Sequence, residues 1–248
     1  DCVRQSAIDS GADPAAVHTV LSPADPERFD RPRDPSYLRR TFGFSERHQV
    51  VTAAGRLDPG KGYESLLRAF ARLGASHPDA RLLVCGATFT RDGADRRLRD
   101  LADELGLGER VVFAGARRDM PEIYAGSDLF CLPTRNEAFG FVFTEAMTAG
   151  LPVVAARSGG VPEIVVDGET GLLAEVDDDR ALAEHLGSLL DDPERARRMG
   201  EAGRRRVFET FAPEVVSARW SARIEAFLAS ADGQRRGGRV ASRSASAA

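Results

Sequence analysis

The stretch NEAFGFVFTEAMTAGLPVVAARSGGV, residues 136–161, carries two glutamates, Glu137 and Glu145, in a mostly apolar run. An ionised carboxylate in apolar surroundings is costly unless hydrogen-bond donors satisfy it. Glu137 precedes a Phe-Gly turn, and Glu145 lies one to two turns into the helix expected after that turn. The hydroxyl groups of a polyol ligand would satisfy both carboxylates.

The start of this helix predicts a phosphate site. Gly140 frees the backbone where the loop enters a helix beginning near Phe141, so the amides up to Val142 are unpaired donors at the positive end of the helix dipole. Such an end suits a phosphate group. Glu137 would then hold hydroxyls on one side of the phosphate and Glu145 a vicinal diol, such as a ribose, on the other. This arrangement indicates a sugar nucleotide.

A second interpretation of the same helix needs no ligand. Thr144, Glu145 and Thr148 fall at helical spacing and could form the solvated face of an amphipathic helix.

Lys61 is the only lysine among the 34 Lys and Arg residues. In a chain so biased toward arginine, the exception indicates a site that needs a compact ammonium, although chance is the alternative. Lys61 follows Pro59-Gly60 at the start of a predicted helix, where a cation is favourable chiefly if an anion binds there too. Arg56, at the end of a predicted strand, could reach the same place.

The spacing Gly55-x4-Gly60-Lys61 also imitates a phosphate loop of the Walker A type. The next residue is Gly62 rather than the Ser or Thr that would hold magnesium, and no strand reads as four apolar residues ending in Asp. These departures disfavour an ATPase or GTPase.

Composition indicates a globular enzyme domain. The 248 residues are 42% apolar, enough for a substantial core, and the net charge of −4 argues against nucleic-acid binding. Cys85 and Cys131 lie in apolar runs, where we expect small buried thiols. Unpaired cysteines of this kind suit a reducing compartment. The scattered histidines predict no metal site, and the sequence has no apolar run of 18 residues. We therefore expect a cytoplasmic protein.

Short apolar runs alternate with helical patterns, which predicts an α/β fold, a Rossmann-like doubly wound parallel sheet. The expected strands are 49–54, 81–86, 110–114, 128–132, 152–156 and 171–175. The expected helices are 62–73, 94–105, 121–125 and 141–149, with three more from residue 178 onward. Because ligands bind beyond the carboxyl ends of such strands, loops 55–62 and 133–140 should lie together at one sheet edge.

At these residues the chain resembles the retaining, nucleotide-sugar-dependent glycosyltransferases of family GT4, which have the GT-B fold. The resemblance rests on an E-x7-E motif from Glu137 to Glu145, followed by AMTAGLPVVA and GGVPEIV. The loop AAGRLDPGKGYESLLRAF, residues 53–70, is similar to the family's donor-diphosphate loop. The likeness spans roughly residues 14–230.

The resemblance implies the C-terminal half of a GT-B fold, which binds a nucleoside-diphosphate sugar as donor. The sugar, of hexosyl type, would pass with retention to an acceptor hydroxyl in carbohydrate biosynthesis. Arg56 and Lys61 would neutralise the leaving diphosphate with the amides of residues 140–142. Glu137 would position sugar hydroxyls and Glu145 the ribose diol. No metal or further cofactor is expected, since two cations and a helix end can take its place.

Other positions are expected to shape the site. Phe139 and Phe141 would shape and dry the pocket, and by family position alone the base would lie near Arg117. Gly159-Gly160 is either a tight turn after a strand or a second close approach to the ligand.

The resemblance also divides the chain. Residues 10–30 resemble the family's passage between its two domains, although Ser22-Pro23-Ala24-Asp25 stands where members usually have Asn-Gly. We expect residues 1–30 to be a remnant of the first domain with the hinge, and residues 31–212 to form a nucleotide-sugar-binding domain. Residues 213–231 should form a C-terminal helix, and residues 232–248 a disordered tail. An acceptor carbohydrate or lipid would bind through an N-terminal domain that this sequence lacks.

The basic tail leaves two interpretations open. Its arginines could contact anionic lipid at the periphery of a membrane, or they could simply be solvated. They are Arg235, Arg236, Arg239 and Arg243.

Three functions remain open at this point. The chain could be half of an active transferase, a nucleotide-sugar-binding module without transferase activity, or a non-transferase GT-B enzyme such as a sugar-nucleotide epimerase. The last would need its own acid and base, and no obvious histidine or carboxylate pair offers them.

Overall fold

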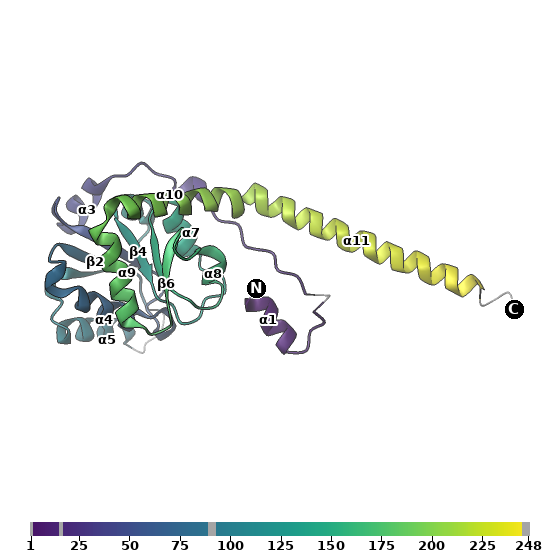
Figure 1. The fold of residues 1–248 in the computed structure, drawn as a ribbon, viewed down its shortest axis with the longest axis horizontal. Coiled ribbons are helices and arrows are strands. Elements are labelled where there is room, and N and C mark those ends of the chain that lie inside the picture. The colour runs from purple at the N-terminus through teal and green to yellow at the C-terminus, as the bar shows by residue number, and fades with distance from the viewer. Residues whose placement is uncertain (1, 15–16, 89–92, 245–248) are drawn as a thin grey trace.

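A computed structural model describes residues 2–14, 17–88 and 93–244, with the backbone alone for Cys2 and residues 230–244. Its centre is one parallel sheet with helices around it (Figure 1). The strand order is β3-β2-β1-β4-β5-β6. The six expected strands are confirmed, and each begins and ends within one residue of its expected bounds. They are β1 (Gln49–Ala54), β2 (Ala80–Cys85), β3 (Val111–Gly115), β4 (Leu129–Leu132), β5 (Val153–Ala156) and β6 (Gly171–Ala174).

The sheet has its topological switch point between β1 and β4. From β1 the chain winds outward to β2 and β3, then returns beside β1 to form β4, with Val51 opposite Leu129, and winds the other way to β5 and β6. Right-handed crossovers in opposite directions place the helices that follow β1 and β4 on opposite faces of the sheet. Such folds bind ligands in the crevice at this point.

The predicted helices are confirmed, and three helices follow residue 178. They are α4 (Tyr63–Leu73), α5 (Ala94–Glu104), α6 (Met120–Gly126), α7 (Phe141–Thr148), α9 (Asp179–Asp191), α10 (Pro193–Thr210) and α11 (Pro213–Ser244). α4 packs against α5 and α9, while α7 packs against α10. Asp178 and Asp192 accept hydrogen bonds from the amides of Ala181 and Arg195 and so begin α9 and α10.

Several short helices were not predicted. These are α1 (Cys2–Asp9), α2 (Pro26–Phe29), α3 (Pro35–Phe42), α8 (Val161–Ile164) and the 3₁₀ turns η1 (Pro59–Lys61), η2 (Gly74–Ser76) and η3 (Gly108–Arg110). α2 and α3 each begin with proline after a capping aspartate, Asp25 or Asp34. α2 packs against α6 and α7, and α3 packs against α6.

The C-terminal segment differs from the expectation. Residues 232–244, expected to be disordered, continue α11 to Ser244, whereas residues 245–248 lie outside the described part of the chain. No proline follows Pro213, so no residue sterically blocks the helix, although glycines at 233, 237 and 238 have low helix propensity. The side chains of the tail arginines, from Arg235 to Arg243, are not among those described.

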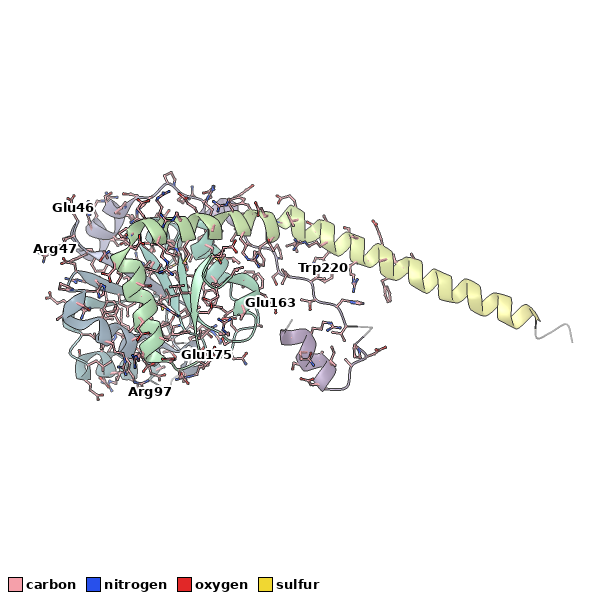
Figure 2. All side chains as sticks on the ribbon, in the orientation of Figure 1. Glu46, Arg47, Arg97, Glu163, Glu175 and Trp220 are labelled. Atoms are coloured by element: carbon pink, nitrogen blue, oxygen red, sulfur yellow. The ribbon has the colours of Figure 1, made fainter. Side chains whose placement is uncertain are left out.

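α11 extends away from the sheet (Figure 1), and its apolar side chains Trp220, Ile224 and Phe227 are exposed. Trp220 is labelled in Figure 2. Among the described residues, no helix is long and apolar enough to cross a membrane.

Candidate donor site at the switch point

The two loops expected to share the sheet edge are in direct contact. The loop after β1 forms η1, and the loop after β4 lies against it. The backbone amide of Arg135 donates to the Gly60 carbonyl at 2.8 Å, and the Thr134 hydroxyl donates to the same oxygen at 3.1 Å. The loops of the switch point are therefore one hydrogen-bonded unit.

Lys61 and Glu137 form the central ion pair of this unit. The Lys61 ammonium donates to the Glu137 carboxylate at 2.6 Å, and the two side chains are only 17% and 14% exposed. Buried charges are retained when they are paired, because removing one partner leaves the other uncompensated. The sequence placed both residues at one edge, but it did not predict that they touch.

Glycine is required at one position in each loop: Gly62 allows the loops to approach each other, and Gly140 allows the turn into α7. Gly62 has φ +72°, and a Cβ there would lie 2.0 Å from the Pro133 carbonyl oxygen. Gly140, at φ +88°, caps α7, and its Cβ would lie 2.6 Å from the Phe143 ring. Side chains are excluded at both positions, by left-handed backbone and by lack of space.

Gly159 and Gly160 lie directly against the loop that carries Glu137. They form a turn that leads into α8, so the turn interpretation is confirmed. The close approach that they permit is to the protein itself: a Cβ on Gly159 would lie 2.2 Å from the Glu137 carbonyl oxygen, to which the Gly160 amide donates at 2.7 Å. The turn thus fixes the backbone of Glu137 through the hydrogen bond from the Gly160 amide.

The N-terminus of α7 offers backbone donors, as expected. The amides of Phe141 and Val142 lie in the first turn, where a helix provides no acceptor. Phe139 is half-buried and packs edge-on against Phe141 and Phe211, with ring centroids 4.9 and 5.8 Å apart. Phe141 is 52% exposed. Phe139 therefore supports the loop, while Phe141 stands at the surface beside the helix start.

Glu145 lies in the second turn of α7 in a poorly solvated place. Burial raises the pKa of its carboxyl, an effect that the charge of Arg28 on α2 partly offsets. The Tyr124 hydroxyl on α6 donates to it at 3.4 Å, a long contact. A carboxylate held this way has capacity for further donors.

The threonines beside Glu145 contradict the solvated-face interpretation of α7. Thr144 and Thr148 are both 1% exposed. Their hydroxyls donate back to the helix carbonyls of Phe141 and Thr144, at 2.9 and 2.7 Å. The polar spacing along this helix is therefore internal hydrogen bonding and not a wet surface.

Glu145 leads to a pH-dependent prediction. Because its folded pKa is raised, the folded state binds the proton more tightly than the unfolded state does, so the contribution to stability falls as pH rises from the unfolded pKa, near 4.5, through the folded pKa. Glutamine does not titrate. We expect Glu145→Gln to melt progressively higher than the parent chain as pH rises from 4 to 7, measured by circular dichroism. A difference in melting temperature independent of pH would contradict this, and Glu184→Gln on the exposed face of α9 is the control.

Arg56 and Arg117 each pair with an aspartate two residues further along the chain. Arg56 follows β1 at the correct edge, but its side chain is 65% exposed and pairs with Asp58 at 3.4 Å. Arg117 follows the edge strand β3 and donates to Asp119 at 2.9 and 2.6 Å, which lowers the pKa of Asp119 to about 2. Tyr37 donates to the same carboxylate. Arg117 is thus engaged with its own loop, and its assignment to the nucleotide base stays a prediction.

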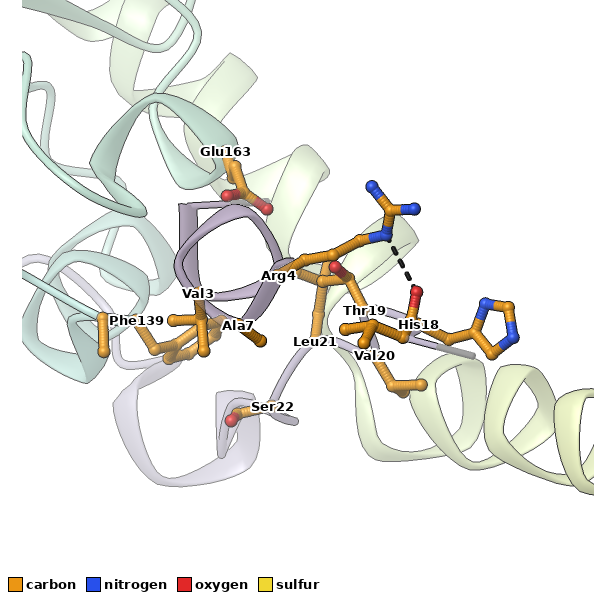
Figure 3. A pocket seen from close by; sticks show the side chains of 12 residues that line it. Val3, Arg4, Ala7, His18, Thr19, Val20, Leu21, Ser22, Phe139 and Glu163 are labelled. Atoms are coloured by element: carbon orange, nitrogen blue, oxygen red, sulfur yellow. Dashed lines mark hydrogen bonds between the residues drawn. The ribbon is translucent and has the colours of Figure 1, made fainter. Parts of the chain in front are cut away.

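A cavity of about 320 Å³ adjoins the site on the side of the N-terminal segment (Figure 3). Phe139 and Glu163 of the sheet domain face α1 and residues 17–22 across it. Arg4 donates to the Val17 carbonyl at 2.9 Å and ties α1 to this segment. The Phe139 ring, on the loop that carries Glu137, therefore faces residues 17–22, the segment that leads into the sheet domain.

The thiols of Cys85 and Cys131 are buried in the sheet, as expected. Burial raises the pKa of Cys85 to about 12, so this thiol stays protonated. In the described part of the chain no group of three or more His, Cys, Asp or Glu side chains could hold a metal ion.

With this geometry in place, known proteins can be compared. The family model described as "Glycosyl transferases group 1" matches residues 37–206. D-inositol 3-phosphate glycosyltransferase of Corynebacterium glutamicum is 38% identical over 198 residues, 77% of this chain and 47% of that protein. The GDP-mannose-dependent monoacylated alpha-(1-6)-phosphatidylinositol monomannoside mannosyltransferase of the same species is 36% identical over 220 residues, 84% of this chain and 56% of that protein.

Solved structures show the same fold. The crystal structure of HepE from Anabaena in complex with UDP and glucose superimposes with a TM-score of 0.82 at 27% identity, over 90% of this chain and 60% of that one. The chain thus spans about half the length of the curated relatives it matches. The matched residues include both loops of the switch point, and the sheet is the Rossmann-like half of a GT-B glycosyltransferase. The chain belongs to the group 1 glycosyl transferases.

Proposed function

We propose that this chain is the donor-binding half of a retaining, hexosyl-type glycosyltransferase that uses a nucleoside-diphosphate sugar. The observation that carries the proposal is the part-buried ion pair of Lys61 and Glu137 at the switch point. The loop that carries Glu137 leads directly into α7, which offers the amides of its first turn and the part-buried Glu145. Related proteins support the donor class, since one is named as GDP-mannose-dependent and another is described with UDP and glucose.

The chemistry follows from the charges. Transfer requires a diphosphate to leave while the sugar becomes oxocarbenium-like, so negative charge grows on the phosphates and positive charge on the sugar. The Lys61 ammonium has three protons to donate, and Glu137 accepts one of them in the donor-free chain. The other two, with the amides of Phe141 and Val142, stabilise the leaving phosphates.

The two glutamates take different parts of the donor in this proposal. Glu137 sits beside the cation and accepts hydrogen bonds from the hydroxyls of the transferring sugar. Glu145, in the second turn of α7, accepts both hydroxyls of the ribose. Its incomplete hydrogen bonding in the donor-free chain, with one contact of 3.4 Å from Tyr124, leaves room for that diol. The acceptor would bind through a further, N-terminal domain.

Binding of nucleoside diphosphate to the 248-residue chain tests this proposal. Titration calorimetry with UDP, GDP and ADP in the presence of a chelator should give saturable heat with at least one of them, because the site supplies its own cations. The matching nucleoside without phosphates serves as the control and should bind far more weakly. Absence of heat with all three diphosphates would overturn the proposal.

A further inference from the structure

Arg135 links the two loops of the site to a third one. Its Nη1 donates to the Pro59 carbonyl at 2.6 Å, while its Nε donates to both oxygens of Asp177, at 2.8 and 3.1 Å. Its own backbone amide holds the Gly60 carbonyl at 2.8 Å. One residue thus fixes two consecutive carbonyls of η1, immediately before Lys61, from the loop that also carries Glu137.

Asp177 has an unusual backbone that fits this role. With φ 63°, it is the only non-glycine residue with positive φ in the described ranges. Aspartate tolerates this conformation better than most residues, yet it is sparsely populated and persists where surrounding contacts demand it. The contact here is the ion pair with Arg135, in which one Nε–H is shared between both carboxylate oxygens across 42 residues of sequence.

We propose that Arg135 is a positioning residue, which together with Asp177 clamps η1 so that the Lys61 ammonium is held at the diphosphate position. This inference rests on the function proposed above. The clamp matters because η1 is a single turn between Asp58 and the left-handed Gly62, and none of its three residues is buried. A turn this short keeps its geometry through its neighbours.

The contacts of Arg135 argue against a role as a direct phosphate ligand. The guanidinium is 33% exposed and lies between two carboxylates, with Asp177 at 2.8 Å and Glu64 on α4 at 3.5 Å. Its charge is already balanced, and Nη1 is directed at a backbone carbonyl. By contrast, Lys61 pairs with one carboxylate among the residues that the structure describes, that of Glu137.

The two roles predict opposite effects of Asp177→Asn. Asparagine accepts the left-handed backbone, so the loop keeps its path while the charged pair is lost. If Arg135 is a clamp, loosening η1 should weaken diphosphate binding. If Arg135 is a ligand, freeing it from its carboxylate should strengthen binding.

The experiment compares Arg135→Gln, Asp177→Asn and the parent 248-residue chain by calorimetry with the best-binding nucleoside diphosphate and its monophosphate. Each variant should lose roughly tenfold in diphosphate affinity, about 1.4 kcal/mol, and little in monophosphate affinity. Arg135→Lys, which can keep one contact but not both, should recover part of the loss. The matched control is Arg204→Gln on α10. This change breaks an ion pair with Asp30, in which Arg204 donates two hydrogen bonds at 3.0 and 2.6 Å.

Amide hydrogen exchange provides a readout that needs no ligand. The amide of Lys61 donates to the Asp58 carbonyl at 3.0 Å within η1. It should exchange faster in Arg135→Gln and Asp177→Asn than in the parent, and at the parent rate in Arg204→Gln. Unchanged exchange and unchanged diphosphate affinity would overturn the inference, as would tighter binding by Asp177→Asn or equal losses for both nucleotides. If the parent chain binds no diphosphate, the proposed function fails, and exchange alone still decides whether Arg135 clamps η1.

Discussion

Glu137→Gln is expected to lower turnover a hundredfold to a thousandfold while nucleoside diphosphate binds at least as tightly as to the parent. The loss of rate is that typical of deleting one preorganised polar contact to a transition state. The retained affinity follows from the ion pair, because Glu137 competes with phosphate for the Lys61 ammonium. Initial rates with donor and acceptor, in a transfer-active protein that carries an acceptor domain, measure the first effect. Calorimetry measures the second.

The pattern of the two losses distinguishes between roles for Glu137. An interaction made only in the transition state lowers kcat and leaves binding of the leaving group intact. If diphosphate affinity falls as far as the rate, the carboxylate acts mainly by holding Lys61 in place. Glu175→Gln is a suitable control, because Glu175 lies at the same sheet edge and its side chain is 75% exposed. Its ion pair with Arg157 is long, at 3.4 Å. It should change neither quantity.

The strands and the meeting of the two loops were predictable from local patterns. Parallel strands are covered on both faces, so each reads as a continuous apolar run, such as residues 129–132, where all four side chains are buried. Since the carboxyl ends of parallel strands share an edge, loops after two such runs must lie on the same side of the sheet. The glycines at 62 and 140 marked where those loops turn.

The pairing of side chains across the site was not predictable in the same way. Lys61 and Glu137 are 76 residues apart, and Arg135 and Asp177 are 42 apart. Their contacts depend on the order of the strands and on loop conformations that no periodicity records. One signal was available at Asp25-Pro26 and Asp34-Pro35, where a capping residue before proline predicts a helix start.

Two expectations from composition need different corrections. The polar spacing of Thr144 and Thr148 suggested a wet face, but small hydroxyls can donate to their own helix and remain buried. The arginine-rich tail suggested disorder because it lacks apolar periodicity, whereas the backbone continues α11 up to Ser244, with helix-favouring arginines opposed by three glycines. In both cases backbone hydrogen bonding competes with hydrophobic patterning.

Lys61→Ala is expected to reduce nucleoside diphosphate affinity roughly tenfold to a hundredfold, because a hydrogen bond to a charged group is worth about 1.5–3 kcal/mol. We assign the Lys61 ammonium to the outer phosphate, which a monophosphate lacks, so monophosphate affinity should change little. Calorimetry with the two nucleotides of one base measures the difference. Equal losses for both would show that the ammonium does not bind the outer phosphate.

Lys61→Arg tests why this chain has a lysine only here. It keeps the charge, but a planar guanidinium needs more room than an ammonium that is 17% exposed and lies 2.6 Å from its partner. We therefore expect Lys61→Arg to recover little of the affinity that Lys61→Ala loses. Arg56→Ala should cost less than either, because Arg56 is 65% exposed and already paired with Asp58. If arginine at position 61 restores full diphosphate binding, the site requires only a positive charge, and the single lysine among the 34 cationic residues has no chemical explanation.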